Sequence, residues 1–395
     1  MSTMTKADLE AMIKDAIGPE LAALRTEIVA APRGFAAGIQ GDLKVPAEDP
    51  EKGIRAARCI RALACARGDH TRAAQIAEKW GDPVVAKALS ESVFEDGGAI
   101  IAPEFSEEVI DLLTARTTVR ALGASPVPMN SGSLTLPFLH AGSTASYVGE
   151  LQNIPTSQQQ VRQMQLSVKK LAALTPLSND LIRDAGPKAD AMVRNDLVRS
   201  MSLREDLAFI RDDGTEGKPK GMRYWADAAN VFPRTQAAGQ NTLATAIADL
   251  GKACRLLEEQ NVAMTNPGWL LSPRSKWHLM TLLDGSGNKV FWDEMQKGTL
   301  LTFPYRATTQ IPNNLGVAGD ESEIYLAEFV TLIIGENTQL LIDVFPGGAY
   351  HDGSSVVSGI SSDQTVIRTI ARHDFGARHN GKEIAVITDV DWAAA

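Results

Sequence analysis

The residues that most suggest chemistry lie in the segment DDGTEGKPKG, residues 212–221. Glycines followed by a lysine are typical of loops that cradle phosphate groups. Here, however, Gly214 and Gly217 are too close together for that motif, and Pro219 stands where a serine or threonine would bind the metal ion. The segment is therefore predicted to be a solvent-facing turn that follows a helix.

A second candidate is the pair of histidines in RHDFGARH, where His373 and His379 flank Asp374. Histidine and carboxylate side chains are common metal ligands. On a straight strand an offset of six residues places both histidines on one face but about 20 Å apart, so a structural role is predicted. His278 and His351 have no nucleophile at a recognisable spacing, and the chain lacks a G-x-S-x-G elbow.

The sequence therefore predicts no catalytic, cofactor-binding or metal-binding residue, and the chain is not expected to be an enzyme. The chain contains 48 aspartate and glutamate residues, and folding could bring two of their carboxylates together. A hydrolase whose carboxylates meet only after folding is a remote alternative.

The turn at residues 212–221 belongs to a longer stretch, Val168 to Trp225, around which we expect the chain to be organised. It begins as a strand, continues as a helix from Pro187 to Arg211, and ends in the Gly/Lys turn. Proline suits the first position of a helix, and 25 residues would measure roughly 37 Å. One apolar face predicts a spine helix that packs on a sheet with its other side in solvent.

Alternating apolar residues before and after a polar segment, residues 149–160, predict a long β-hairpin. Its tip is too polar to belong in a core, because it contains several glutamine and asparagine residues. A hairpin of this length is only marginally stable alone, so we expect it to lie on another surface.

The N-terminal part is helical in pattern. Residues 5–31 are predicted to form an amphipathic helix that either packs on its own domain or self-associates through a narrow apolar stripe. After a Gly/Pro-containing linker, short helices are predicted at 53–66, 71–79 and 84–90, and a domain boundary near 94–98.

Further predictions cover the rest of the chain. A helix is expected at 104–114, a strand at 118–127, an α/β or α+β unit at about 236–335, strands at 338–344, 365–375 and 383–390, and a loop at 353–362.

Composition limits the possible partners. A chain of 395 residues with a net charge of −9 is too acidic for tight phosphate binding, so any contact with nucleic acid is expected to be weak and non-specific. The chain has three cysteines, an odd number that does not suggest a set of paired disulfides. We find neither a secretion signal nor an apolar run long enough to span a membrane. Neither a structural disulfide nor membrane insertion is expected.

Four motifs occur in order between residues 123 and 222: ASYVGELQNIP, KKLAALTPLSNDLIRD, LVRSMSLREDLAFIRDDGT and GKPKGM. Through them the sequence resembles the major capsid protein family of tailed bacteriophages, which has the Hong Kong ninety-seven fold. The likeness continues more loosely to about Asp391 and covers about three quarters of the chain. The resemblance implies an α+β phage major capsid fold.

The resemblance also implies a division of the chain. The expected parts are a scaffold-like helical N-terminal extension (1–95), an N-arm and lead-in (96–127), an extended hairpin loop (128–175), a peripheral domain with spine helix and contact loop (176–235), an axial domain (236–335), and peripheral-domain strands that return to the axial domain (336–395).

On this resemblance the chain would self-assemble as hexamers and pentamers into the icosahedral head of a phage or prophage, enclosing double-stranded DNA. The virion would be assembled in the host cytoplasm, with a portal and with decoration or scaffold and protease proteins as partners. A gene transfer particle, or an encapsulin-like compartment with protein cargo, is the nearest alternative. The subunit contacts it implies are Tyr147, Glu150, Ile154, Arg162, Lys169, Asp212, Lys218 and Lys220.

One family feature is missing. Members that crosslink their subunits use a lysine just before a proline near the hairpin tip, whereas here Ile154 precedes Pro155. We therefore expect no covalent crosslinks between subunits. We also expect the N-terminal extension to be retained.

Overall fold

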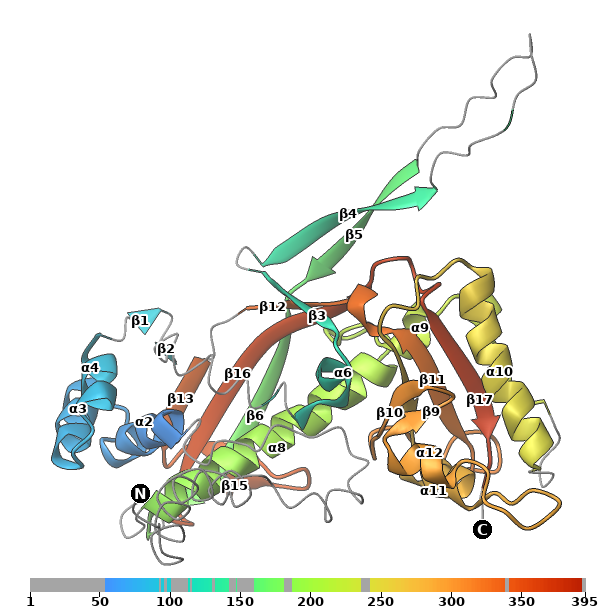
Figure 1. Ribbon diagram of the computed structural model, residues 1–395. Coiled ribbons are helices and arrows are strands. Elements are labelled where there is room, and N and C mark those ends of the chain that lie inside the picture. The colour runs from blue at the N-terminus through green and yellow to red at the C-terminus, as the bar shows by residue number, and fades with distance from the viewer. Residues whose placement is uncertain are drawn as a thin grey trace, which may run out of the picture.

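The computed structural model describes residues 54–91, 94–95, 98–100, 113, 116–129, 132–141, 147, 160–180, 187–235, 242–337 and 341–392. Two β-sheets stand side by side, and a two-stranded hairpin projects from them (Figure 1). The predicted helix at 5–31, and all but Leu113 of the one at 104–114, lie outside the described residues.

The larger sheet is built around β16 (Gln364–Ala377), its longest strand. One edge of β16 pairs with β13 (Leu341–Pro346) and then with β12 (Leu332–Glu336), and the opposite edge pairs with β6 (Lys169–Ser178) over ten residues. The sheet is completed by β1 (Phe94–Glu95), β2 (Gly98–Ile100) and β3 (Ser125–Pro128).

The predicted spine helix is confirmed as α8 (Pro187–Arg211), which lies along the larger sheet (Figure 1). Its middle contributes Leu197 and Met201 to a core shared with the N-terminal helices and the larger sheet. Its last turns contribute Phe209 and Ile210 to a second core, which lies between the two sheets. The middle of α8 therefore buries one side, whereas its last turn, in which Ala208, Phe209 and Ile210 are all buried, is covered on more than one side, so the single apolar face predicted for the whole helix is not found there.

The smaller sheet has the order β7-β17-β11-β8-β10-β9. Residues of β8 alternate between two cores: Trp269 and Leu271 face one, and Leu270 faces the other. A strand buried on both faces has a continuously apolar sequence, as PGWLL has here. The strands are β7 (Val231–Pro233), β8 (Pro267–Leu271), β9 (Thr299–Leu300), β10 (Phe303–Ala307), β11 (Ser322–Glu328) and β17 (Ile384–Val390).

Three helices contribute to the same core on one face of the smaller sheet. They are α10 (Leu243–Glu259), α11 (Pro273–Thr281) and α12 (Trp292–Gln296). The predicted mixed unit is thus present, but β17 returns from the C-terminal part to pair with β11, and β12 belongs to the larger sheet. The limits of 236 and 335 are therefore not those of the smaller sheet, which also takes β7 from before residue 236.

The N-terminal helices are α2 (Ile54–Cys65), α3 (His70–Lys79) and α4 (Pro83–Glu91), each within one residue of its predicted bounds. Asp69 caps α3 by accepting a hydrogen bond from the Arg72 backbone N–H. Their buried side chains pack in one core with those of α8 and β16. These residues are consequently part of the body of the subunit.

The strand predicted at 118–127 is wrong in its first half, where the structure has α6 (Thr118–Ala121) followed by β3. The β-branched residues Thr117, Thr118 and Val119 favour a strand locally. Tertiary contacts override this preference, because both carboxylate oxygens of Asp206 accept a hydrogen bond from the Thr118 N–H.

The predicted hairpin is present, formed by β4 (Ser133–Ala141) and β5 (Gln160–Ser167). Its returning strand ends at Ser167, however, and the following β6 is part of the larger sheet, so the expected limit of 175 is too late. The predicted loop at 353–362 contains a further short strand. The remaining short elements are α9 (Met222–Trp225), two 3₁₀ turns, Ala228–Asn230 and Phe329–Thr331, and the pair β14 (Ala349–His351) and β15 (Val356–Ser358).

Candidate assembly surfaces

The base of the hairpin is anchored by apolar side chains on one of its faces. Leu136 lies opposite Met164 in the antiparallel register, and Leu134 lies opposite Leu166. Met164 and Leu166 press on β16 so closely that a Cβ on Gly376 would lie 2.7 Å from the Met164 sulfur. The hairpin beyond this base leaves the body of the molecule (Figure 1). It therefore has a fixed base and a projecting arm.

The predicted contact residues of the hairpin are only partly described. Tyr147 and Arg162 are exposed, whereas Glu150 and Ile154 lie outside the described residues. Lys169 stands opposite His373 in the larger sheet. Burial raises the pKa of Asp374, and hydrogen bonds from Ser167 and Phe375 and the charge of Lys169 oppose that rise. Lys169 thus acts within its own subunit, and its role between subunits stays a prediction.

The predicted contact loop, residues 212–222, is a closed turn that begins at the C-terminal end of α8 and ends where α9 begins, at Met222. Asp212 accepts a hydrogen bond of 2.6 Å from Arg204. The Asp213 carboxylate accepts hydrogen bonds from the N–H and the hydroxyl of Thr215, which lower its pKa. The backbone of Asp213 pairs with that of Lys220 in an isolated antiparallel β-bridge across the loop. The loop is therefore held by its own contacts. The predicted solvent-facing turn is confirmed for residues 213–217, whereas Pro219 and Gly221 are buried.

The two lysines of this loop differ. Lys218 is half-buried, with its Nζ 3.3 Å from the carboxylate of exposed Glu216. The Nζ of Lys220 lies 4.3 Å from the centre of the Trp225 ring, a cation–π contact within the chain. Both follow the C-terminal end of a helix, whose dipole repels anions, so the loop does not have the geometry of a phosphate site.

His373 has the structural role that the sequence predicted. It is buried, its ring meets Phe209 edge-on at 5.1 Å between centroids, and burial lowers its pKa. His379 lies in the turn after β16, where its backbone N–H donates to Glu383. Within the described ranges, no group of three or more His, Cys, Asp or Glu could hold a metal ion.

Sequence reasoning missed a buried ion network that joins α6 to α8 and β12. Arg120 donates to Glu205 and to Glu336, each at 2.6 Å. Beside it, burial raises the pKa of Asp206 to about 7, against the hydrogen bonds that this carboxylate accepts from Thr118. The sequence showed little sign of this network. The adjacent acidic residues Glu205 and Asp206 could be seen in it, but the residues that they bind, Arg120 and Thr118, lie more than 80 positions away.

A second network was also missed. The buried carboxylate of Glu323 in β11 accepts hydrogen bonds from Arg211 at the end of α8, from Arg223 in α9 and from the Tyr325 hydroxyl. Charge-assisted bonds of this kind are stronger than neutral ones. The two networks therefore tie α8 to both sheets and fix the path of the spine helix.

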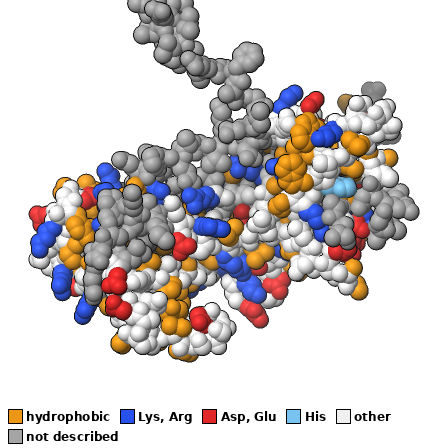
Figure 2. Space-filling view, turned by 90° about the horizontal axis from the view of Figure 1, so that it is seen from below, with side chains coloured by type: hydrophobic (Ala, Val, Ile, Leu, Met, Phe, Trp, Pro, Cys, Tyr) orange, Lys and Arg blue, Asp and Glu red, His pale blue; other side chains and the backbone are white. Residues whose placement is uncertain are grey.

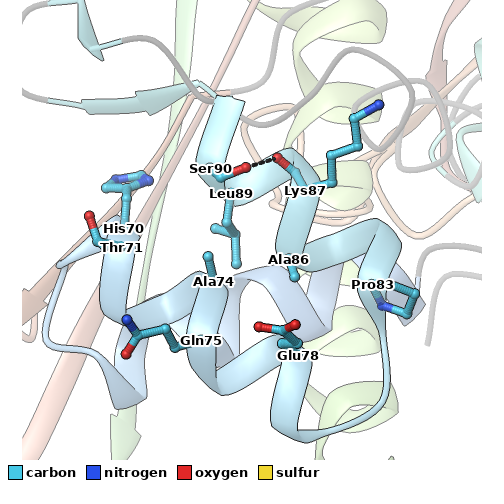
Figure 3. Close-up of a pocket in the computed structure, with 10 residues that line it drawn as sticks. All are labelled: His70, Thr71, Ala74, Gln75, Glu78, Pro83, Ala86, Lys87, Leu89 and Ser90. Carbon is cyan, nitrogen blue, oxygen red and sulfur yellow. Dashed lines mark hydrogen bonds between the residues drawn. The ribbon is translucent and has the colours of Figure 1, made fainter.

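Two cavities lie among the described residues. A groove of about 680 Å³ lies between α3 and α4. Its charged and polar side chains do not converge: Lys87 points away from Glu78, and His70 lies at the opposite end of the groove from Pro83 (Figure 3). A smaller cavity of about 300 Å³ lies between the hairpin base and the loop after α10. On the face seen in Figure 2, Lys and Arg side chains are interspersed with Asp and Glu. No helix in the described part of the chain is both long and apolar enough to cross a bilayer.

Comparisons with known proteins agree with this architecture. A family described as the phage capsid family matches residues 97–389. The major capsid protein of Klebsiella oxytoca phage phiKO2 is 38% identical over 324 residues, which are 82% of this chain and 75% of that protein. The capsid polyprotein of Pseudomonas phage PAJU2 is 24% identical over 371 residues, which are 87% of this chain and 55% of the polyprotein.

Solved structures share the fold. The capsid of the native GTA particle aligns with a TM-score of 0.55 at 16% identity, covering 69% of this chain and 90% of that one. The structure from Microbacterium phage Oxtober96 aligns with a TM-score of 0.53 at 15% identity, covering 76% of this chain and 97% of that one. The two sheets, the spine helix and the projecting hairpin are thus those of a phage capsid subunit with the Hong Kong ninety-seven fold, and the chain belongs to the phage capsid family.

Proposed function

We propose that this chain assembles with copies of itself, as hexamers and pentamers, into an icosahedral head that encloses double-stranded DNA. The observation that carries the proposal is the match of the phage capsid family over residues 97–389, together with 38% identity to the phiKO2 major capsid protein.

The hairpin supplies a physical reason for assembly. The base of the hairpin shares a core with Ile333 of β12 and Val127 of β3, but the hairpin formed by β4 and β5 projects from the body of the subunit (Figure 1). Two strands alone are only marginally stable in water, so the arm gains stability by lying on a neighbouring subunit. Exposed Tyr147 and Arg162 are proposed to contact that neighbour, as are Glu150 and Ile154 at the tip.

The interior partner is proposed to be DNA held by weak, non-specific contacts. A chain with a net charge of −9 releases few counterions from a phosphate backbone, and tight binding would hinder dense filling of the head. A portal and, where the phage encodes them, decoration, scaffold and protease proteins complete the particle. The chain itself is proposed to have no enzymatic role.

A gene transfer particle is the second candidate, because the capsid of the native GTA particle shares the fold. The two candidates differ in the length and origin of the enclosed DNA. Sequencing nuclease-protected DNA from particles would favour the phage head if one defined genome is recovered, and the gene transfer particle if random host fragments are recovered.

The N-terminal helices are proposed to remain in the mature particle. Buried side chains of α2, such as Ile60 and Leu63, share a core with Leu197 and Met201 of the spine helix. Removing the helices would expose this apolar surface to water. Assembled particles should therefore contain the full 42.4 kDa chain, and an intact mass lacking about the first 95 residues would contradict retention.

Expression of the chain without other phage proteins tests self-assembly. The full chain should sediment as large particles, and a variant with residues 139–160 replaced by a short turn should remain small, because it lacks the arm but keeps the anchored base. A full chain that stays monomeric or dimeric, or a shortened variant that assembles equally well, would contradict the proposed mechanism.

A further inference from the structure

Large apolar side chains lie exposed over one edge of the smaller sheet. Trp277 on α11 is 56% exposed, and two residues of the loop that follows, Leu283 and Val290, are 53% and 43% exposed. The backbone holds these two together, because Leu283 pairs with Lys289 in an isolated β-bridge and the Val290 N–H donates to the Leu282 carbonyl. We call Trp277, Leu283 and Val290 the apolar patch. Exposed apolar surface of this kind marks a contact with another protein.

Two lysines border the apolar patch. The Nζ of Lys276 lies 5.9 Å from the centre of the Trp277 ring, and the Nζ of Lys289 lies 3.8 Å from the centre of the Trp292 ring. Neither lysine forms an ion pair with a carboxylate in the described part of the chain. A surface that covers the patch should therefore offer an apolar side chain together with an acidic one.

The opposite edge of the same sheet carries a different exposed surface. The sheet runs from β7 to β9, and α10 packs against β17, the strand next to β7. At the other edge, α12 packs against β9 and α11 packs against α12. The helices α10 and α11 therefore lie over opposite edges of the sheet (Figure 1).

The outward side of α10 has both features that the apolar patch needs. Ile247 is exposed, and Glu258 lies on the same side of the helix about three turns later. Arg255 pairs with Glu259 at 3.4 Å, whereas Glu258 forms no ion pair within the described ranges. This side of α10 thus presents an apolar side chain and an unpaired carboxylate.

The two surfaces can meet only between copies of the chain, because they lie over opposite edges of one sheet. A contact between unlike surfaces is heterologous, and its repetition by rotation closes a ring. A hexamer or a pentamer is such a ring. The partner that fits the apolar patch is therefore a second copy of this chain.

We propose that the apolar patch of one subunit packs on α10 of the next, with Trp277 against Ile247 and Lys289 beside Glu258. This inference rests on the proposed function, because it names the surfaces through which the rings form. It adds a contact that is separate from the hairpin arm and from the contact loop.

A charge in the apolar patch tests the contact. In the full chain expressed alone, Val290→Glu should keep the wild-type unfolding temperature but lower the yield of sedimenting particles by roughly tenfold or more, because it buries an unpaired charge between subunits. Val84→Glu on α4 is the matched control, since Val84 is 44% exposed, and it should assemble as the wild type does.

The outcomes separate this contact from the proposed function. A wild type that forms no particles would contradict self-assembly itself. Wild-type particles together with an undiminished yield from Val290→Glu, or an equal loss in Val84→Glu, would overturn this contact alone.

Engineered cysteines identify the partner surface. Thr281→Cys places a thiol on α11 one turn after Trp277, and Ala248→Cys places one on α10 beside Ile247. Both positions are exposed. The two changes are made singly and together in the full chain.

The native thiols are kept out of the reaction. Cys65 and Cys254 are changed to serine in every variant, and buried Cys59 stays, because burial raises its thiol pKa to about 12.

On mild oxidation of assembled particles, the double variant should give a ladder of disulfide-linked chains up to the hexamer, because each subunit then links to a neighbour on both sides. Each single variant should stay monomeric. Absence of a ladder from the double variant would overturn the proposal. Dimers from the Thr281→Cys variant alone would overturn it as well, because the patch would then meet its own copy.

Discussion

At the scale of single residues, the position of α6 depends on ion pairs between residues that are far apart in the sequence. Arg120 bridges Glu205 and Glu336, and the neighbouring carboxylate of Asp206 holds the first turn of α6. Breaking a buried pair by removing one partner costs several kcal/mol, since the other charge stays buried. The network therefore specifies where α6 lies on the spine helix.

Asp206→Asn should change how stability depends on pH. Burial raises the pKa of Asp206 from 3.8 to about 7, so between those values the folded state holds a proton that the unfolded state has lost. The wild-type free energy of unfolding then falls as pH rises from about 4 to 7, by up to roughly 1.4 kcal/mol per pH unit from this group. Asparagine is neutral throughout and removes this contribution.

Urea unfolding of both proteins at pH 5, 6, 7 and 8 measures the difference. Stability of the wild type relative to the variant should decline up to about pH 7 and then level off. Titration of nearby His373 is common to both proteins and cancels. Parallel curves would show that Asp206 does not carry the raised pKa.

At the scale of elements, the sequence predicted those whose signals are local. The spine helix was placed to the residue, because Pro187 suits its first position and Arg211 directly precedes the polar turn that begins at Asp212. Elements decided by distant partners were missed. The strand preference of Thr118 yields to Asp206, and the break between β5 and β6 arises because β6 pairs with β16, about 200 residues away.

The site was predicted to a similar extent. The segment 212–221 was placed as a turn after a helix from its composition alone, and the structure shows that Gly214 and Gly217 there adopt positive φ. The two ion networks were not predicted, because the charged partners of Arg120 and of Glu323 lie on other helices and strands, far away in the sequence.

Leu63→Ala in α2 tests whether the N-terminal helices belong to the body. Leu63 is 2% exposed and packs in one core with Leu197 and Met201. Truncation should lower the free energy of unfolding by about 2–5 kcal/mol in the main transition. Val84→Ala on α4, 44% exposed, is the matched control and should cost less than about 0.5 kcal/mol. A main transition that Leu63→Ala leaves unmoved would mean that the helices fold separately.

Lys218→Glu tests the contact loop. The ion pair of Lys218 with exposed Glu216 contributes about 0–1 kcal/mol, so the variant should fold normally and yet give fewer particles. Lys79→Glu on α3 makes the same charge change elsewhere and should assemble as the wild type does. Lys220→Glu is less informative, because it also removes the contact with Trp225. Unchanged particle yield in the Lys218 variant would remove this loop from the interface.

At the scale of the whole molecule, two sheets are joined through one helix and one arm projects beyond them. Ion networks at Arg120 and at Glu323 join α8 to both sheets, and the arm is the part that we propose contacts a neighbouring subunit. Strength of the assembly should come from many modest contacts summed over several neighbours.

The hairpin tip offers no lysine before its proline, because residues 151–154 are LQNI. Particles boiled in detergent should therefore run as a single band at the monomer mass. A ladder of multimers would show covalent links between subunits.

Electron microscopy of the purified full-length chain, expressed alone, tests the central claim most directly. We predict closed shells of uniform size with five-fold vertices, the geometry that hexamers and pentamers of one subunit produce. Discrete monomers or dimers under the same conditions would contradict the claim that this capsid-family chain assembles by itself.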